Sequence, residues 1–236
     1  MFEVRNIAFA YDRRPVLKDV SFMISPGEVV SIIGANGAGK TTLLRILATL
    51  LLPNSGTILS EGVNAFERPL KYRRQLGFLP ENPALYEDMT VKAYLVYRAK
   101  LKGEFSRRVR RRVDEAVEMC RLGEMLRSPI SALSAGMKKR VALADALLLH
   151  PRVLLLDDFL AGLDQTMRQS IAGILSDAAA FSSVIITGHE LDDFAAWTTR
   201  FLVLKNGVIS ASVPVSGADR AGIKARMLDE LKGPQL

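Results

Sequence analysis

The stretch VVSIIGANGAGKTT, residues 29–42, decides the fold of this chain. Val29–Ile33 is an apolar run that predicts a buried β-strand, and residues 34–41 match the pattern G-x-x-x-x-G-K-[ST] in full. The glycines of this pattern let backbone amides curl around phosphate groups, and the positive end of the following helix points at them. A strand, a phosphate loop and a helix in this order predict a nucleotide site on an α/β core.

The residues of this loop have separate expected roles. Lys40 is expected to reach the β- and γ-phosphates, and the Thr41 hydroxyl to hold Mg²⁺. A plain glycine-rich turn is the alternative, but the position between a strand and a helix favours phosphate binding. The residues expected to contact the nucleotide here are Asn36, Gly37, Ala38, Gly39, Lys40, Thr41 and Thr42.

Such a loop requires a carboxylate that orders Mg²⁺ at the end of another strand. Leu154-Leu155-Leu156 is apolar, which predicts a strand buried on both faces, and Asp157 follows it directly. We therefore expect Asp157 to be the carboxylate on the metal side.

The rest of the chain alternates between short strands and helices. Thr90 is expected to cap a helix, and Asn206-Gly207 predicts a hairpin turn. A helical middle separates two β-rich ends, so we expect an α/β lobe from residues 1–85 and 151–212, a helical lobe from 86–150, and a short tail at 213–236. Further strands are expected at 2–7, 20–24, 56–59, 77–79, 184–187, 201–204 and 208–212. Helices are expected at 41–51, 90–101, 106–122, from the turn at 134–136 to before 151, at 165–180, and in short form at 223–231.

Composition limits where the chain works. With 236 residues, 49% of them hydrophobic, it can bury a sizeable core as one globular unit. The net charge of +7 suits anionic partners such as nucleotide phosphates, a cytoplasmic leaflet or nucleic acid. A single cysteine, Cys120, fits a reducing compartment. The most apolar stretch, Leu43–Leu52, is too short to span a membrane, so we expect a cytoplasmic chain that reaches the membrane through a partner.

Between the loop and Asp157 lies Leu133-Ser134-Ala135-Gly136-Met137, which resembles the signature of ABC ATPases, usually Leu-Ser-Gly-Gly-Gln. The chain resembles the ATP-binding subunits of ABC transporters over roughly residues 1–212. The resemblance implies an α/β fold: a RecA-like P-loop NTPase core with N-terminal antiparallel β elements and an inserted α-helical subdomain. It also implies ATP and Mg²⁺ as cofactors.

Other positions match this family in order. Tyr11 lies where the family places an aromatic ring that stacks on adenine, although simple surface packing is the alternative. Asp164, in Ala161-Gly162-Leu163-Asp164, resembles the D-loop at the dimer interface. His189 resembles the switch histidine that contacts the γ-phosphate, whereas His150 is interpreted as structural. Ser134 and Gly136 are expected to face phosphate.

Three departures from the family pattern bear on catalysis. Asp158 stands where the family usually has a glutamate that polarises the attacking water, and Phe159 replaces a proline. Aspartate is one methylene shorter, so we predict slow hydrolysis with Asp158 as the catalytic base. Glu81 replaces the glutamine of the Q-loop and stays an oxygen donor to Mg²⁺, although an ordinary loop glutamate is the alternative. The signature carries Met137 for glutamine, and Ala135 for one glycine.

The resemblance implies a homodimer or heterodimer of ATPase subunits and a separate integral membrane permease. The sequence does not choose between the two dimers, and it does not identify the permease or the transported substrate. Leu79-Pro80-Glu81 and Gly136-Met137 suggest an export-type subunit. A soluble ABC ATPase without a transport role, and a regulatory subunit with weak hydrolysis, are the alternatives. The arginines of residues 107–112 predict a solvated, salt-bridged helix face rather than a nucleic-acid or membrane patch, and no nucleic-acid partner is expected.

Overall fold

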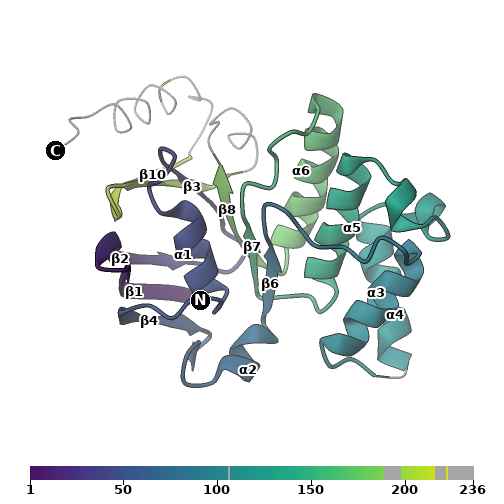
Figure 1. Cartoon of the computed structure of the whole chain (residues 1–236), viewed down its shortest axis with the longest axis horizontal. Coiled ribbons are helices and arrows are strands. Elements are labelled where there is room, and N and C mark those ends of the chain that lie inside the picture. Colours follow the sequence, from purple (N-terminus) through teal and green to yellow (C-terminus); the bar gives the residue numbers. More distant parts are fainter. Residues whose placement is uncertain (106, 189–197, 216–221, 223–236) are drawn as a thin grey trace.

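The computed structural model describes residues 1–105, 107–188, 198–215 and 222. Its described part contains a four-stranded sheet, a six-stranded sheet and a group of helices (Figure 1). The first sheet has the strand order β2 (Arg14–Ile24), β1 (Phe2–Tyr11), β4 (Ser55–Ser60) and β5 (Val63–Asn64). The second has the order β10 (Val208–Pro214), β9 (Arg200–Lys205), β3 (Val29–Ile33), β8 (Ser183–Gly188), β7 (Val153–Leu156) and β6 (Leu76–Leu79).

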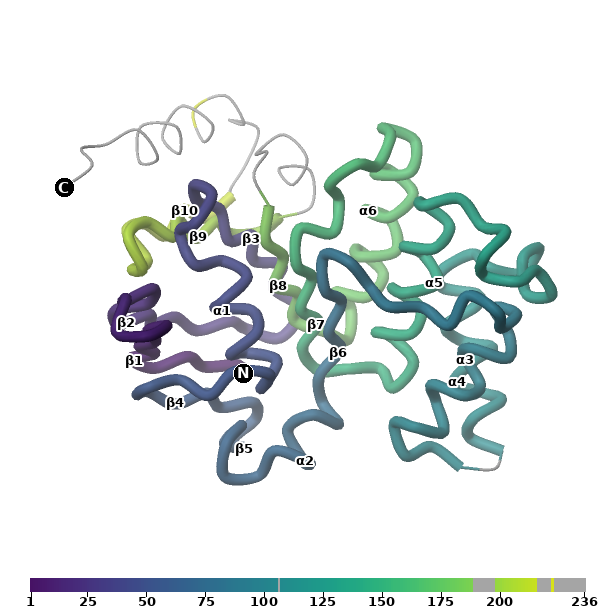
Figure 2. Tube along the Cα trace, in the orientation of Figure 1, coloured from purple at the N-terminus to yellow at the C-terminus, as the bar shows by residue number. Residues whose placement is uncertain are grey.

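The six-stranded sheet is parallel except for one edge. Strands β3, β6, β7, β8 and β9 run parallel, and only β10 pairs antiparallel, with β9. Every residue of β3, β7 and β8 is buried, as expected for a parallel sheet covered on both faces. The chain path through this sheet can be followed in Figure 2. Because the parallel strands end at one edge, the loops that follow them lie together there.

The N-terminal strands form an antiparallel hairpin that is longer than the sequence suggested. Residues Asp12 and Arg13 both have positive φ, 44° and 68°, as in the tight hairpin turns that match strand twist. The strands expected at 2–7 and 20–24 therefore extend toward each other to Tyr11 and Arg14. Strand β5 and helix α2 (Pro69–Arg73) were not predicted, because each is too short to show a periodic pattern.

Two hydrophobic clusters lie on opposite faces of the parallel sheet. In β3, Val29 and Ile33 belong to one cluster and Val30 and Ile32 to the other, as the two-residue period of a strand requires. Helix α1 (Lys40–Leu47) packs in the cluster that also holds the antiparallel sheet. The other cluster holds α3 (Val91–Leu101), α4 (Arg107–Met119), α5 (Ala135–Leu147) and α6 (Gln165–Ala179), which lie together on one side in Figure 1.

Helix α1 ends earlier than predicted. It was expected to reach residue 51, but it stops at Leu47 because Thr49 adopts a left-handed backbone with φ 57°. The amides of Leu50 and Leu51 both donate to the carbonyl of Arg45, which closes the helix end. The caps of later helices match the prediction better, since the Thr90 side chain accepts a hydrogen bond from the Ala93 amide at 3.3 Å.

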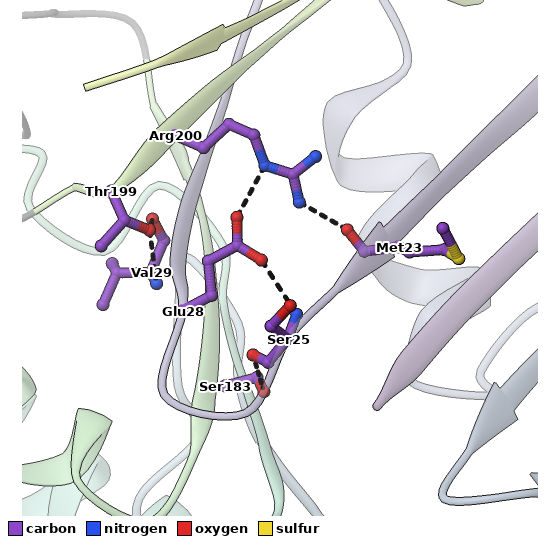
Figure 3. Close-up of polar contacts among 7 residues, drawn as sticks. All are labelled: Met23, Ser25, Glu28, Val29, Ser183, Thr199 and Arg200. Carbon is purple, nitrogen blue, oxygen red and sulfur yellow. Dashed lines mark hydrogen bonds and ion pairs between the residues drawn. The ribbon is translucent and has the colours of Figure 1, made fainter. Parts of the chain in front are cut away.

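A polar network connects the turn between β2 and β3 to the amino-terminal ends of β8 and β9 (Figure 3). Glu28 accepts from the Arg200 guanidinium at 2.7 Å and from the Ser25 amide at 2.9 Å. Arg200 also donates to the carbonyl of Met23, and the Ser183 hydroxyl donates to that of Ser25 at 2.9 Å. These contacts hold the start of β3 so that its other end presents the phosphate loop.

The helices confirm two interpretations of the sequence. Arg110 and Arg111 form ion pairs with Asp114 and Glu115, at 3.7 and 3.6 Å, along the exposed face of α4. His150 lies 3.2 Å from Glu115 and stacks on Phe181, which agrees with a structural role. The residues between the helices include two short 3₁₀ turns, at Gly123–Met125 and Ile130–Ala132. No helix in the described part of the chain is both long enough and apolar enough to cross a membrane.

A buried acid joins α5 to α3. The Asp145 side chain is 11% exposed and forms ion pairs with Arg98 and Lys102, each at 2.9 Å. Burial raises the pKa of this carboxyl, but the charge and hydrogen bonds of Lys102 and Arg98 outweigh burial, so the pKa lies below its ordinary value. The Tyr94 hydroxyl lies 3.4 Å from the same carboxylate, and burial raises the pKa of that phenol.

Replacing Asp145 with asparagine should lower the free energy of unfolding by about 2–3 kcal/mol at pH 7, because two half-buried cations lose their partner. A folded-state pKa below the unfolded value of about 3.9 means that this stabilisation is complete above about pH 5. It is lost as the pH falls through the lowered folded pKa, so the difference between wild type and variant should shrink only at pH values below the unfolded pKa of about 3.9. Urea unfolding across this pH range measures the effect. Asp114→Asn, which removes an exposed ion pair, is the matched control and should change little.

Candidate functional site

Three loops and the end of one strand meet at the carboxyl edge of the parallel sheet. The phosphate loop follows β3, residues 157–158 follow β7, Glu81 follows β6, and Thr187 is the next-to-last residue of β8. Together they line an open cleft of about 550 Å³. The lining residues are Val16, Asn36, Gly37, Gly39, Lys40, Thr41, Thr42, Glu81, Asp157, Asp158 and Thr187. The structure therefore brings together most of the site residues that the sequence predicts.

Lys40 lies at the centre of the phosphate loop. Its ammonium donates to the carbonyls of Gly34 and Ala35, at 2.7 and 3.0 Å, and only 8% of the residue is exposed. Burial lowers the pKa of this lysine, while Asp158 and Asp157 act in the opposite direction. The loop thus holds a cation beside the first turn of α1, where phosphate oxygens can replace the carbonyls.

Glycine is required at two positions of this loop by close approach of the chain. A Cβ atom at Gly34 would lie 2.3 Å from the carbonyl oxygen of Leu204 in β9. Gly39 has φ 102°, and a Cβ there would lie 2.9 Å from the Leu17 side chain. Helix α1 begins directly after Gly39 without a side-chain cap, so its first turn faces the cleft with backbone amides.

Thr41, Asp157 and Thr187 form a hydrogen-bonded set across three chain segments. The hydroxyls of Thr41 and Thr187 donate to the same Asp157 oxygen, Oδ1, at 3.1 and 2.8 Å. The Thr187 hydroxyl also accepts from the Asp158 amide at 3.0 Å. The sequence analysis missed Thr187; the one available signal was a polar residue at the end of an otherwise apolar strand.

This set fits a magnesium ion. A threonine hydroxyl and carboxylate oxygens are hard donors of the kind that Mg²⁺ takes together with nucleotide phosphates and water. Among the described residues, no group of three or more His, Cys, Asp or Glu side chains is placed to hold a metal ion. A metal at this site would therefore depend on phosphate oxygens from a bound nucleotide as well as on Thr41 and Asp157.

Asp158 has an uncommon backbone conformation. Its φ is 43°, a left-handed value that costs about 1 kcal/mol or more for a residue with a Cβ atom. The bond from its amide to Thr187 supports this bend, and the residue lines the cleft beside Lys40 and Glu81.

The signature residues lie outside this cleft. Ser134 caps α5 by accepting from the Met137 amide at 3.3 Å, and Asp164 caps α6 by accepting from the Met167 amide at 2.8 Å. Gly136 lies inside α5, not in a turn as predicted, because the Ser134 cap starts the helix at the next residue. A Cβ at Gly136 would lie 2.9 Å from Met167 Cε, the flexible end of a side chain on α6.

Two further predicted residues, Tyr11 and Ala38, do not line the cleft. Tyr11 is 42% exposed and contacts Phe9 edge to face at 4.7 Å. Ala38 lines a neighbouring hollow of about 870 Å³ that shares Asn36 and Gly37 with the cleft. His189 lies outside the described residues.

Comparison with known proteins identifies relatives of this chain. Residues 17–161 match the family model described as "ABC transporter". The chain is 35% identical over 210 residues to an uncharacterized ABC transporter ATP-binding protein, YxlF, from Bacillus subtilis, covering 89% of this chain and 70% of that protein. It is 31% identical to the ABC-type transporter ATP-binding protein EcsA from the same organism, covering 98% of this chain and 94% of the relative.

Solved structures agree with these matches. The ATP-binding subunit of an ABC transporter superposes with a TM-score of 0.83 at 29% identity, covering all of this chain and 95% of that one. A dimeric bacterial ABC transporter cassette gives a TM-score of 0.80 at 26% identity, covering 92% of this chain and all of the cassette. The fold is thus that of the P-loop NTPases, with an α/β core, as predicted. The chain belongs to the ABC transporter family, among its ATP-binding proteins.

Proposed function

We propose that this chain is the ATP-binding subunit of an ABC transporter and couples ATP binding and hydrolysis to transport by a separate membrane permease. One observation carries the proposal: Lys40, Thr41, Asp157 and Asp158 face one cleft at the carboxyl edge of the sheet. Family membership supports the same activity. We also infer a cytoplasmic position on the inner face of the membrane, held there by the permease.

Each side chain of the cleft has a distinct role in this proposal. The amides of Asn36, Gly37, Ala38, Gly39 and the start of α1 surround the β- and γ-phosphates, and Lys40 neutralises their charge. Thr41 and Asp157 hold Mg²⁺, with Glu81 as a further oxygen donor. The bound nucleotide would supply the phosphoryl group. Bound Mg²⁺ would supply the positive charge that screens the Glu81 carboxylate from the γ-phosphate. Tyr11 stacks on adenine, and His189 contacts the γ-phosphate.

Asp158 acts as the base that orients the attacking water. Its carboxylate is set back by one methylene relative to glutamate, so we expect slow turnover. The left-handed bend at Asp158 supports a base directed at the phosphates, since it turns the residue into the cleft. A regulatory subunit with very weak hydrolysis is the second candidate, and Asp158 and Glu81 are the residues that favour it.

Two copies are needed for a complete site in this proposal. Ser134, Gly136 and Asp164 lie away from their own cleft, so they are available to the nucleotide of a second ATPase subunit. A solved relative, the bacterial cassette, forms a dimer. Homodimer and heterodimer both satisfy this geometry.

Binding of a fluorescent ATP analogue to the purified chain tests the nucleotide part of the proposal. Affinity should fall at least tenfold when EDTA removes Mg²⁺, because Thr41 and Asp157 then lose the ion that links them to phosphate. Absence of any saturable ATP binding in the presence of Mg²⁺ would contradict the proposal. Binding without turnover would favour the regulatory subunit.

We infer that the permease binds a groove between α2, the end of α3 and α5. Nine residues line this hollow of about 320 Å³: Leu70, Arg73, Arg74, Leu76, Leu101, Lys102, Gly103, Ala146 and Leu149. Leu70 and Leu101, which are 77% and 57% exposed, give this groove an apolar surface. Basic residues flank them, so the groove suits a cytoplasmic permease segment that is apolar in the middle and acidic at its edge.

Leu101→Asp should release the chain from permease-containing membranes, with at least tenfold less ATPase recovered after a wash in moderate salt, while ATP turnover of the purified chain stays the same. Met23→Asp is the matched control, because Met23 is 58% exposed on β2, away from this groove. Co-sedimentation with membranes that contain the permease measures both variants. Equal retention of the two variants would place the contact elsewhere.

Leu79-Pro80-Glu81 and Gly136-Met137 are the residues that favour an export-type partner. Movement of substrate into or out of sealed vesicles that contain the permease tests the direction.

A further inference from the structure

Lys139 joins two parts of the chain that carry different functions. It lies in the first half of α5, the helix that Ser134 of the signature caps. Its ammonium donates to the backbone carbonyls of Phe159 and Ala161, at 2.9 and 2.5 Å, in the loop that follows β7. The nitrogen also lies 5.8 Å from the centre of the Phe159 ring. One side chain thus spans from the signature helix to the segment directly after Asp158.

The charge of Lys139 acts on the cleft as well as on this loop. Burial lowers the pKa of its ammonium, while Asp158 and Glu81 favour the charged form and Arg168 opposes it. Asp158 therefore has a second cation, Lys139, near it in addition to Lys40, and Lys139 also acts on Glu81. Arg168, whose guanidinium donates to the carbonyl of Leu163 at 2.9 Å, holds the next part of the loop.

We propose that Lys139 is a positioning residue: it ties the signature helix to the loop that carries Asp158, so that movement of the signature moves the base. The proposal rests on the proposed hydrolysis, and goes beyond it by giving the route between two sites. Ser134 engages the nucleotide of the second subunit, whereas Asp158 serves the nucleotide of its own subunit. Because of Lys139, the position of α5 affects both the contact that Ser134 makes with one nucleotide and the position of Asp158 at the other.

The adjacent lysine shows why this role belongs to one position. Lys138 forms its ion pair with Glu87 at 2.7 Å, so its contact stays within the helical segment at residues 86–150. Lys139 points the other way and reaches carbonyls of the α/β core. The two hydrogen bonds that its ammonium donates to backbone oxygens, at 2.9 and 2.5 Å, restrain the loop more than a single flexible side-chain contact does.

Lys139→Gln should lower kcat about tenfold while KM for ATP changes less than twofold, because the loop shifts but the phosphate loop does not. Lys138→Gln, the matched control, should keep both constants. Hydrogen–deuterium exchange of residues 158–164 should become faster in Lys139→Gln and stay unchanged in Lys138→Gln. Exchange measures the tether itself and does not depend on hydrolysis.

Chemical rescue separates the ammonium from general damage to α5. Lys139→Cys treated with 2-bromoethylamine regains an ammonium at the same distance, and should recover most of kcat and the slow exchange. Iodoacetamide should give no recovery. The natural thiol does not interfere, since Cys120 is fully buried and burial raises its pKa to about 12.

Each of these measurements either supports or contradicts the positioning role of Lys139. Unchanged exchange in Lys139→Gln overturns the tether, and faster exchange with unchanged kcat overturns the positioning role. Lack of recovery by the aminoethylated variant also overturns the role of the ammonium. Absence of turnover in the wild type would count against the proposed hydrolysis, and exchange would then still show whether the tether exists.

Discussion

Lys40→Ala is expected to lower ATP turnover by at least about a hundredfold and to weaken ATP binding. Lys40 supplies the one loop ammonium that the structure holds against the carbonyls of Gly34 and Ala35, beside the first turn of α1. Removing a preorganised hydrogen-bond donor that stabilises the charge developing in the transition state costs about 10²–10³ in rate in comparable sites. Turnover measured by phosphate release, with binding measured separately, distinguishes lost affinity from lost chemistry.

Lys92→Ala is the matched control for this change. Lys92 is an exposed lysine of α3 and takes no part in the cleft lining, so binding and turnover should match the wild type. Lys40→Arg is a second test, because it keeps the charge but needs more room than the loop offers. Full activity of Lys40→Ala would remove the phosphate loop from the proposed mechanism.

Asp158→Glu is expected to raise turnover by about tenfold to a hundredfold. The added methylene carries the carboxylate further into the cleft, and misplacement of a reacting group by about 1 Å can cost about 10² in rate. The hydrogen bond from the backbone amide of residue 158 to the Thr187 hydroxyl does not depend on the side chain of residue 158. The left-handed backbone conformation at this residue should therefore persist. Asp158→Asn, which removes the charge at nearly constant shape, should lower turnover at least tenfold.

The two changes together separate three outcomes. A rise with glutamate and a loss with asparagine support a working base held slow by its length. No turnover in the wild type but activity in Asp158→Glu would support the regulatory subunit as the natural state. Unchanged rates in both variants would show that Asp158 is not the base. Asp177→Glu, on the exposed part of α6, controls for a longer acid elsewhere.

Much of the cleft could be predicted from short stretches of sequence. The match at residues 34–41 and the acid after Leu156 each depend on neighbours within a few positions, and the structure places Lys40, Thr41 and Asp157 in one cleft. Thr187 and Lys139 could not be predicted in this way. Thr187 matters only because β8 lies between β3 and β7, and Lys139 only because α5 packs beside the loop after β7.

The end of α1 and the surroundings of Gly136 in the signature also could not be predicted from the sequence. Apolar spacing predicted a helix to residue 51, but the left-handed turn at Thr49 ends it four residues earlier. Gly136 was predicted from family resemblance to face phosphate, whereas in the structure it lies inside α5 beside Met167 of α6. A sequence pattern does not show which distant side chain lies above a glycine.

By itself the sequence determined the phosphate loop, most of the strands and helices in their order, and the acid expected to bind the metal. These depend on backbone conformation and side-chain period, which are local properties of the chain. Tertiary structure alone decided that Thr41 meets Asp157 across 116 positions, that Asp145 is held by Arg98 and Lys102, and that Lys139 reaches the base loop. Such contacts form only when packing of the two hydrophobic clusters brings distant segments within a few ångströms, and no local pattern specifies that packing.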